Sequence, residues 1–143
     1  AEHSYGVALC TMLISDPQLD PRKATLMGLV HDLAEALVGD WTPTQISEAD
    51  KHAKEHAAMH ELVHEVLRAA PRADELEALW KEYEARESRE AALVKDLDRF
   101  EMILQADAYE REDAGQDLSE FFAGVRGRIR HPQVAAWQAH LER

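Results

Sequence analysis

The residues best able to do chemistry are four metal-competent side chains in one short stretch, at His31, Asp32, Glu35 and Asp40. They interrupt an otherwise apolar helical segment. Because a charged group buried alone costs many kcal/mol, such groups pair, shift their pKa or coordinate a cation. His3 upstream and Asp98 downstream are two further candidate ligands. The pattern therefore predicts a divalent-metal site suited to phosphoester hydrolysis.

Imidazole and carboxylate ligands together suit Mn²⁺, Fe²⁺, Co²⁺, Ni²⁺ or Zn²⁺, and Mg²⁺ where oxygen ligands dominate. A divalent ion can lower the pKa of water and neutralise phosphate charge, and phosphoester hydrolysis needs both. At about 100° per residue, His31, Asp32 and Glu35 fall within roughly 100° of one helix surface. Gly28, one turn earlier, is expected to leave space above that arc. The alternative is a buried His–Asp pair that only joins helices, but few basic residues lie nearby to neutralise the other carboxylates.

The elements that must position these residues are predicted to be helices. Apolar periodicity indicates helices over residues 2–15, 21–38, 45–69 and 89–112, a shorter one around Leu76, Leu79, Trp80 and Tyr83, and a closing helix after His131-Pro132. Asp20 resembles an N-cap before Pro21, and Gly39 is suited to a left-handed C-terminal conformation. Since no stretch alternates as a strand does, we expect an all-α helical bundle, with residues 1–143 forming one domain.

Composition and charge restrict the classes of partner. The chain has 143 residues, 45% of them hydrophobic, and a formal net charge of −12. This charge argues against a nucleic acid polymer and against an anionic membrane surface, but it allows a small phosphate-bearing substrate where cations receive it. No apolar run reaches the roughly 18 residues of a membrane span, and no secretory signal is present. The single cysteine, Cys10, fits a reducing compartment, so we expect a cytoplasmic protein.

His3, the His31-Asp32 pair and Asp98 resemble the H…HD…D pattern of the HD-domain metal-dependent phosphohydrolases. That pattern alone indicates only the superfamily. The similarity extends to its 5′-deoxynucleotidase branch through residues 29–35, 38–40, 51–52, 79–84, 94–106 and 131–132. The sequence of residues 101–106, Glu-Met-Ile-Leu-Gln-Ala, is specific to this branch. The chain begins Ala-Glu-His without Met, so we expect that an upstream segment is missing.

The resemblance implies a first metal ion held by His3, His31, Asp32 and Asp98. Periodicity alone does not choose between Asp98 and Asp96, and the family pattern makes that choice. Glu35 and Asp40 match family residues beside the scissile phosphate. Some members place a second cation there, with help from the backbone carbonyl at the position of Trp41. Lys51 and His52 also match and are candidates to attract the phosphate.

The hypothesis that follows is hydrolysis of deoxyribonucleoside 5′-monophosphates to a deoxynucleoside and phosphate. A water molecule attacks the phosphorus in line with the leaving oxygen, and Glu35 orients or deprotonates this water. Asp40 protonates the leaving oxygen or ligates a second ion. The resemblance also implies a homodimer. The alternatives are an HD-type phosphodiesterase or guanosine polyphosphate hydrolase, and a non-catalytic metal-binding helical scaffold.

Other chemically suggestive residues receive simpler interpretations. His52, His56, His60 and His64 recur every four residues, so neighbouring pairs could bind a transition metal, but a solvated face with adventitious binding is favoured. Cys10 and the Phe121-Phe122 pair are interpreted as core, and Lys95 and Arg99 as surface residues in salt bridges.

Overall fold

Helices are the only regular elements in the part of the chain that the computed structural model describes, residues 1–113, 115 and 117–142. In chain order they are α1 (Glu2–Thr11), α2 (Pro21–Val30), α3 (Leu33–Val38), α4 (Glu48–Glu61), the π-helical turn η1 (Leu62–Val66), α5 (Ala73–Ala85), α6 (Arg89–Glu112), α7 (Ser119–Val125) and α8 (Pro132–Leu141). The predicted all-α fold is confirmed. None of the helices described is long and apolar enough to cross a membrane.

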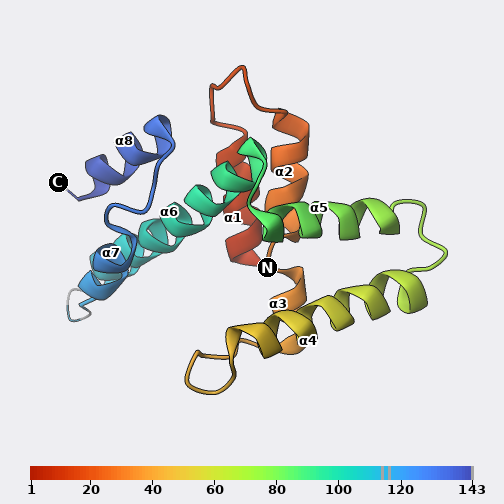
Figure 1. Cartoon of the computed structure of the whole chain (residues 1–143). Coiled ribbons are helices and arrows are strands. Elements are labelled where there is room, and N and C mark those ends of the chain that lie inside the picture. Colours follow the sequence, from red (N-terminus) through yellow and green to blue (C-terminus); the bar gives the residue numbers. More distant parts are fainter. Residues whose placement is uncertain (114, 116, 143) are drawn as a thin grey trace.

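The long helix α6 forms the centre of the main core, and α1, α2, α5, α7 and α8 all contact it (Figure 1). Its apolar residues recur at helical spacing and are fully or almost fully buried at Val94, Leu97 and Ile103. Phe100 extends this core to α8, where its ring lies 5.5 Å from that of Trp137, measured between centroids. A side chain on the buried face of α6 is therefore held in place by several helices at once.

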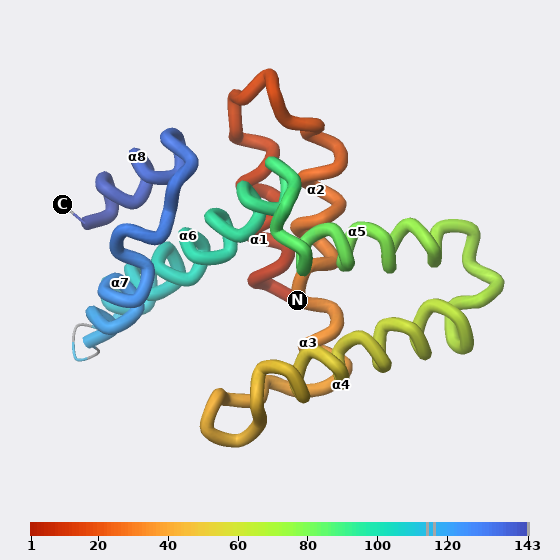
Figure 2. The backbone as a smooth tube through the Cα atoms, viewed as in Figure 1, coloured from red at the N-terminus to blue at the C-terminus, as the bar shows by residue number. Residues whose placement is uncertain are grey.

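A smaller hydrophobic cluster joins α3, α4 and α5 through Ala34, Met59 and Trp80. Met59 and Trp80 are almost completely buried. Figure 2 shows α4 and α5 as two arms that converge at the end far from the main core, where η1 and the loop that follows connect them. This cluster packs the C-terminal end of α4 against α3, the helix that begins at the break where the candidate site lies.

The predicted helix over residues 21–38 is divided at His31 and Asp32. Asp32 has φ −101° and ψ 5°, a conformation that ends α2 and serves as the N-cap position of α3. Gly39 ends α3 with φ 97° and ψ 163°. The positive φ was expected, but the conformation is extended rather than left-handed helical. Two other predicted helices were too long: α1 stops at Thr11, and the helix that begins at Glu48 changes to a π-turn at Leu62.

Gly28 has a role different from the one expected. A Cβ atom built on Gly28 would lie 3.0 Å from the Cα of Ala8, closer than ordinary van der Waals contact. The missing side chain therefore lets the backbones of α1 and α2 approach each other, and Ala8 fills the space beside Gly28 that was expected to be open. This close approach brings His3 on α1 toward His31 at the end of α2.

Two of the core interpretations have different outcomes. The Cys10 thiol is buried in the main core, as expected. Phe122 packs against that core, but Phe121 is 45% exposed and lines a shallow groove with Met102. The paired aromatic residues are adjacent on one helix, so they point in directions about 100° apart and only one of them reaches the core.

Candidate metal centre

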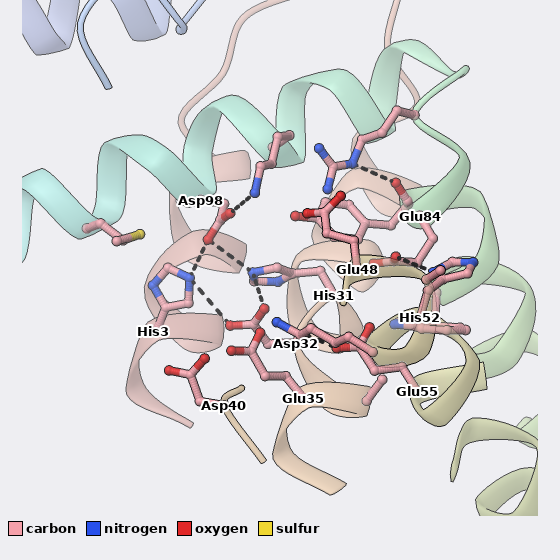
Figure 3. Close-up of a pocket in the computed structure, with 18 residues that line it drawn as sticks. His3, His31, Asp32, Glu35, Asp40, Glu48, His52, Glu55, Glu84 and Asp98 are labelled. Atoms are coloured by element: carbon pink, nitrogen blue, oxygen red, sulfur yellow. Dashed lines mark hydrogen bonds and ion pairs between the residues drawn. The ribbon is translucent and has the colours of Figure 1, made fainter. Parts of the chain in front are cut away.

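Four ligand-type side chains from separate segments meet at one point in the described structure (Figure 3). They are His3 near the start of α1, His31 and Asp32 between α2 and α3, and Asp98 in the middle of α6. Each offers one ligand atom, and all of these atoms lie within 4.8 Å of one another. The predicted first-metal set is therefore brought together by the fold.

The distances within this group are those of ligands around a common centre. Asp98 Oδ1 lies 2.7 Å from His3 Nε2 and 3.6 Å from His31 Nε2. The Asp32 carboxylate lies 3.7 Å from His3 Nε2 and 3.5 Å from His31 Nε2. Both imidazoles thus turn the same nitrogen, Nε2, toward the two carboxylates.

The opposite nitrogen of each ring is engaged by a hydrogen-bond acceptor. His31 Nδ1 donates to the backbone carbonyl of Gly28 at 2.7 Å, and His3 Nδ1 donates to the carboxylate of Glu101. In metalloproteins, acceptors of this kind fix the tautomer of a ligating histidine and make its other nitrogen a better donor. The arrangement leaves Nε2 of both rings as the atom suited to bind a cation.

His31 Nε2 provides the clearest test of whether a metal ion fits. This nitrogen is fully buried and has no hydrogen-bond partner among the described residues, although two carboxylates lie just beyond hydrogen-bond distance. A buried polar atom in this state is costly, and a cation placed between the nitrogen and the carboxylates would satisfy it. The donor set, two imidazoles and two carboxylates, suits a borderline divalent ion.

Protons occupy the cluster in the metal-free protein. Hydrogen bonds to Asp98 and then to Glu101 raise the pKa of His3 to about 10. For Asp98, burial raises the pKa, but the two histidines and Lys95 outweigh burial and hold it well below its usual range. Burial also favours a neutral His31, yet the carboxylates of Asp98 and Asp32 raise its pKa. The excess negative charge at this point therefore binds protons in the absence of a metal.

Glu35 and Asp40 lie next to this cluster at the floor of the same cavity (Figure 3). Burial, a hydrogen bond with Asp40 and the charge of Asp32 raise the pKa of Glu35 to about 7. A pair of carboxyl groups in contact retains one proton because two adjacent negative charges repel. Trp41 is not among the residues that line the cavity, and its indole nitrogen donates to the Val38 carbonyl at 3.1 Å.

The metal-competent residues line one side of a cavity of about 800 Å³, and residues of α4, α5 and α6 form its other walls. The residues predicted to attract phosphate, Lys51 and His52, line it. His52 Nδ1 lies 3.6 Å from a carboxylate oxygen of Glu84. Lys95 and Arg86 also line it. Three permanent cations thus face a cavity in a strongly acidic chain.

Several residues of the cavity were not expected there from the sequence. Lys95 does make the expected salt bridge, 2.8 Å from Asp98 Oδ2, but that contact places it in the cavity. Arg86 follows α5 with a left-handed φ of 57°, and its guanidinium stacks 4.7 Å from the ring centre of Tyr83. Glu101, which contacts His3, could have been found from spacing, since it lies three residues after Asp98 on the same face of α6. No sequence signal identified Arg86.

The structure also shows which of Asp96 and Asp98 lies at the metal-competent cluster, a choice that periodicity left open. Asp96 faces the opposite side of α6, where its carboxylate accepts hydrogen bonds from the backbone nitrogens of Arg130 and His131 at 3.0 and 2.8 Å. It therefore fixes the start of α8. Asp98 alone of the two reaches the imidazoles.

A helical fold with a His, a His-Asp pair and a distant Asp around one point has the arrangement of an HD-type metal centre. The comparison with protein families agrees, because the HD domain model matches residues 1–137. The chain belongs to the HD domain family. The resemblance that the motif indicated is confirmed.

Similar proteins lie in the 5′-deoxynucleotidase branch. The chain is 40% identical to 5′-deoxynucleotidase hdd1 of Schizosaccharomyces pombe over 142 residues, which cover 96% of this chain and 71% of that protein. It is 38% identical to human 5′-deoxynucleotidase HDDC2, with 99% and 70% of the two chains covered. Among solved structures, HD domain-containing protein YGK1 of Saccharomyces cerevisiae aligns with a TM-score of 0.75 at 30% identity, covering 98% of this chain and 73% of that one. A predicted metal-dependent phosphohydrolase from Magnetospirillum magnetotacticum aligns with a TM-score of 0.72 at 28% identity, covering 99% and 75%.

Proposed function

We propose that the chain is a metal-dependent 5′-deoxynucleotidase, which hydrolyses deoxyribonucleoside 5′-monophosphates to a deoxynucleoside and inorganic phosphate. The observation that carries the proposal is the meeting of His3, His31, Asp32 and Asp98, with both Nε2 atoms turned inward, at one end of an open cavity. The relatives at 38–40% identity that bear the name 5′-deoxynucleotidase support the reaction and the substrate class.

These four residues would hold a divalent ion. Their donor atoms suit Mn²⁺, Fe²⁺, Co²⁺, Ni²⁺, Zn²⁺ or Mg²⁺. When bound, such an ion supplies Lewis-acid chemistry, which neutralises phosphate charge and lowers the pKa of water. A second ion held by Glu35, Asp40 and the Trp41 carbonyl stays a prediction, and the position of Trp41 outside the cavity lining does not add support to it.

Glu35 and Asp40 are suited to the proton transfers that hydrolysis needs. Glu35 hydrogen-bonds Asp40 and its pKa is raised to about 7, so Glu35 can take up a proton near neutral pH. We assign Glu35 to orienting or deprotonating the attacking water. The proton that Glu35 takes from the water can pass along the hydrogen bond to Asp40, which delivers it to the leaving 5′-oxygen, so that the alcohol departs uncharged.

The cations of the cavity are suited to binding the phosphate. Lys51, Arg86 and Lys95 come from different segments and all line the cavity, and His52 lies beside them. Lys51 lies 3.9 Å from Glu55, so it is only weakly paired at that distance. These groups offset part of the negative charge of the carboxylates that also line the cavity, and a divalent ion at the HD centre would add further positive charge for a phosphate dianion. The cavity volume of about 800 Å³ is sufficient for a nucleoside monophosphate.

The proposal is tested by measuring phosphate release from a panel of all deoxy- and ribonucleoside 5′-monophosphates with Mg²⁺, Mn²⁺ or Co²⁺. We expect release from deoxynucleotides, and loss of both activity and bound metal in Asp32→Ala. Glu87→Gln, an exposed change outside the cavity, is the matched control. Cleavage only of a phosphodiester or of a guanosine polyphosphate would replace the proposed substrate. A metal-free, inert wild-type protein would instead indicate a helical scaffold.

We also infer from the resemblance to the family that the protein is a homodimer, and from its single cysteine that it acts in the cytoplasm. The buried, unpaired Cys10 is compatible with a reducing compartment. Light scattering on the purified chain tests the first point, because a dimer doubles the 16.2 kDa mass of the chain.

A further inference from the structure

A second group of metal-competent side chains lies outside the HD centre, at the far end of the α4–α5 pair (Figure 2). It consists of His60 at the end of α4, His64 in the π-helical turn η1 and Glu77 on α5. Each offers one ligand atom, and these atoms lie within 4.8 Å of one another. The described residues contain no other such group besides this one and the HD centre.

The helix changes from α to π between the two histidines, at Leu62. In an α-helix, residues four apart are rotated by about 40° relative to each other. Here the hydrogen bond from Leu67 N to the Leu62 carbonyl closes a π-turn, in which more residues make up each turn. The ring centres of His60 and His64 lie 4.3 Å apart. Isolated π-turns within helices are frequent at functional sites.

One carboxylate oxygen of Glu77 is paired with a lysine, and the other has no hydrogen-bond partner among the described residues. Lys81 Nζ lies 2.9 Å from Glu77 Oε1. Glu77 Oε2 is buried, has no hydrogen-bond partner among the described residues, and faces His64 Nε2 at 3.3 Å. In a tetrahedral site with bonds of about 2.0–2.1 Å, neighbouring ligand atoms are about 3.3–3.4 Å apart. The separation between the carboxylate and the imidazole therefore already matches that of two ligands of one ion.

We propose that His60, His64 and Glu77 form a second metal site, which binds a transition-metal ion of the zinc class and joins the η1 end of α4 to α5. Two imidazoles and one carboxylate are a donor set for Zn²⁺, Co²⁺, Ni²⁺ or Cu²⁺ rather than for Mg²⁺ or Ca²⁺. Both histidines are exposed, so a fourth coordination position faces solvent. Because Glu77 Oε2 has no hydrogen-bond partner among the described residues and can serve as a third ligand, this site differs from two surface histidines alone.

The site is separate from the HD centre but lies on the same helix as part of the cavity wall. His52 lines the cavity eight residues before His60, which is about 12 Å along an α-helix. His56, one turn from each of them, packs against the Trp80 ring at 4.8 Å between centroids and belongs to the hydrophobic contact between α4 and α5. The ion would stabilise the pairing of α4 with α5 beyond this contact, where the described residues show only a small apolar cluster.

Zinc binding to the whole metal-free chain, measured by equilibrium dialysis against zinc buffered with a chelator, tests the proposal. We expect His64→Ala to bind one zinc ion fewer per chain than the wild type, and His60→Ala to behave in the same way. His140→Ala, which removes an exposed histidine on α8, should retain the wild-type number. Asp32→Ala should lose the ion of the HD centre and keep this one, so that failure of the two sites can be told apart.

A three-ligand site is distinguished from adventitious binding at two histidines by Glu77→Gln. This variant should bind zinc about tenfold or more weakly at this site, because it loses the anionic ligand. Glu75→Gln, two residues away on the same helix and exposed, is the control. Zinc should also raise the Tm of the wild type by more than that of His64→Ala. Equal zinc affinity in Glu77→Gln and wild type, or an unchanged number of ions in His64→Ala, would overturn the site.

Discussion

The Nδ1–H group of His3 donates to the carboxylate of Glu101, while Nε2 of the same ring contacts Asp98 one turn earlier on α6. Glu101 is only 5% exposed, and Gln105 donates a further hydrogen bond to it. The three side chains therefore form a chain from α6 through the imidazole and back to α6. This relationship fixes the orientation of a proposed metal ligand that otherwise lies at the first turn of a helix, where side chains are poorly constrained.

Glu101→Gln should weaken metal binding at the HD centre by about ten- to a hundredfold, because a neutral acceptor holds the imidazole less firmly and makes it a poorer donor. Metal affinity is measured by competition with a coloured chelator. The variant retains the shape of the side chain but loses the charged hydrogen bond to His3, so its Tm in the absence of metal should also fall. Glu112→Gln, exposed at the end of the same helix, is the control. Wild-type metal affinity in Glu101→Gln would show that Glu101 only packs against His3.

His31 and Asp32 could be selected as candidate ligands from sequence because such residue types are unusual in an apolar helical segment, whereas the complete set with His3 and Asp98 came from the resemblance to the family. The same reasoning could not find the break that divides α2 from α3. Asp32 adopts ψ 5° because its position between the main core and the smaller cluster requires the chain to turn, and that is a tertiary effect. The role of Gly28 was missed for a similar reason, since its partner Ala8 belongs to another helix.

Periodicity identified which residues face inward. It could not assign the contacts of a residue where those contacts depend on a neighbouring helix. Asp96 and Asp98 both lie on buried parts of α6, and only the position of α8 assigns Asp96 to a structural contact. Phe121 was assigned to the core on residue type, yet it lies on a short helix that covers only one side of α6. The second metal group includes Glu77 of α5, which the spacing of the histidines alone does not identify.

Asp96→Ala should destabilise the protein and leave metal binding intact. The change removes a buried acceptor for two backbone nitrogens at the start of α8, so we expect a loss of about 1–3 kcal/mol in the free energy of unfolding. Urea denaturation gives this energy, and elemental analysis of the folded protein gives the metal content. Asp98→Ala is the matched comparison, in which metal should be lost. If the two variants showed the reverse pattern, the assignment of Asp98 as the ligand would be wrong.

Glu35 should make the stability of the metal-free protein depend on pH. Its folded pKa of about 7 is raised above the ordinary value of 4.5, so the folded state binds the proton more tightly than the unfolded state. The resulting stabilisation is complete below pH 4.5 and is lost as pH rises through 7. Glu35→Gln mimics the protonated group, and it should therefore become more stable than wild type by about 1 kcal/mol above a pH of about 7, after allowance for solvent screening.

This difference is measured by denaturation in the presence of a chelator between about pH 4.5 and about pH 8, a range that spans the ordinary and the raised pKa of Glu35. At the acidic end the two proteins should have similar stability. Glu87→Gln, which changes an exposed carboxylate, should show no such pH-dependent gain. A gain in Glu35→Gln that shrinks as pH rises would mean that the folded protein lowers the pKa of Glu35 instead of raising it.

Gly28→Ala should reduce both stability and metal affinity, because the added methyl group meets the backbone of α1. The nearest atoms are Ala8 Cα at 3.0 Å and Ala8 N at 3.2 Å, and backbone atoms cannot rotate away as the end of a flexible side chain can. Separating the two helices should cost about 1–3 kcal/mol, more than the gain in helix propensity of about 1 kcal/mol. The same separation moves His3 on α1 away from His31, so the ligand atoms no longer meet.

Gly124→Ala on α7 is the matched control, since no atom lies within 4 Å of the Cβ it would add. It should be neutral or slightly stabilising. Thermal melts and metal titrations on both variants separate the two effects. A Gly28→Ala protein that lost stability but bound metal as tightly as wild type would show that the HD centre tolerates a change in the α1–α2 separation. In that case the ligands would be positioned mainly by α6, through Glu101 and Asp98, and not by the close approach of the first two helices.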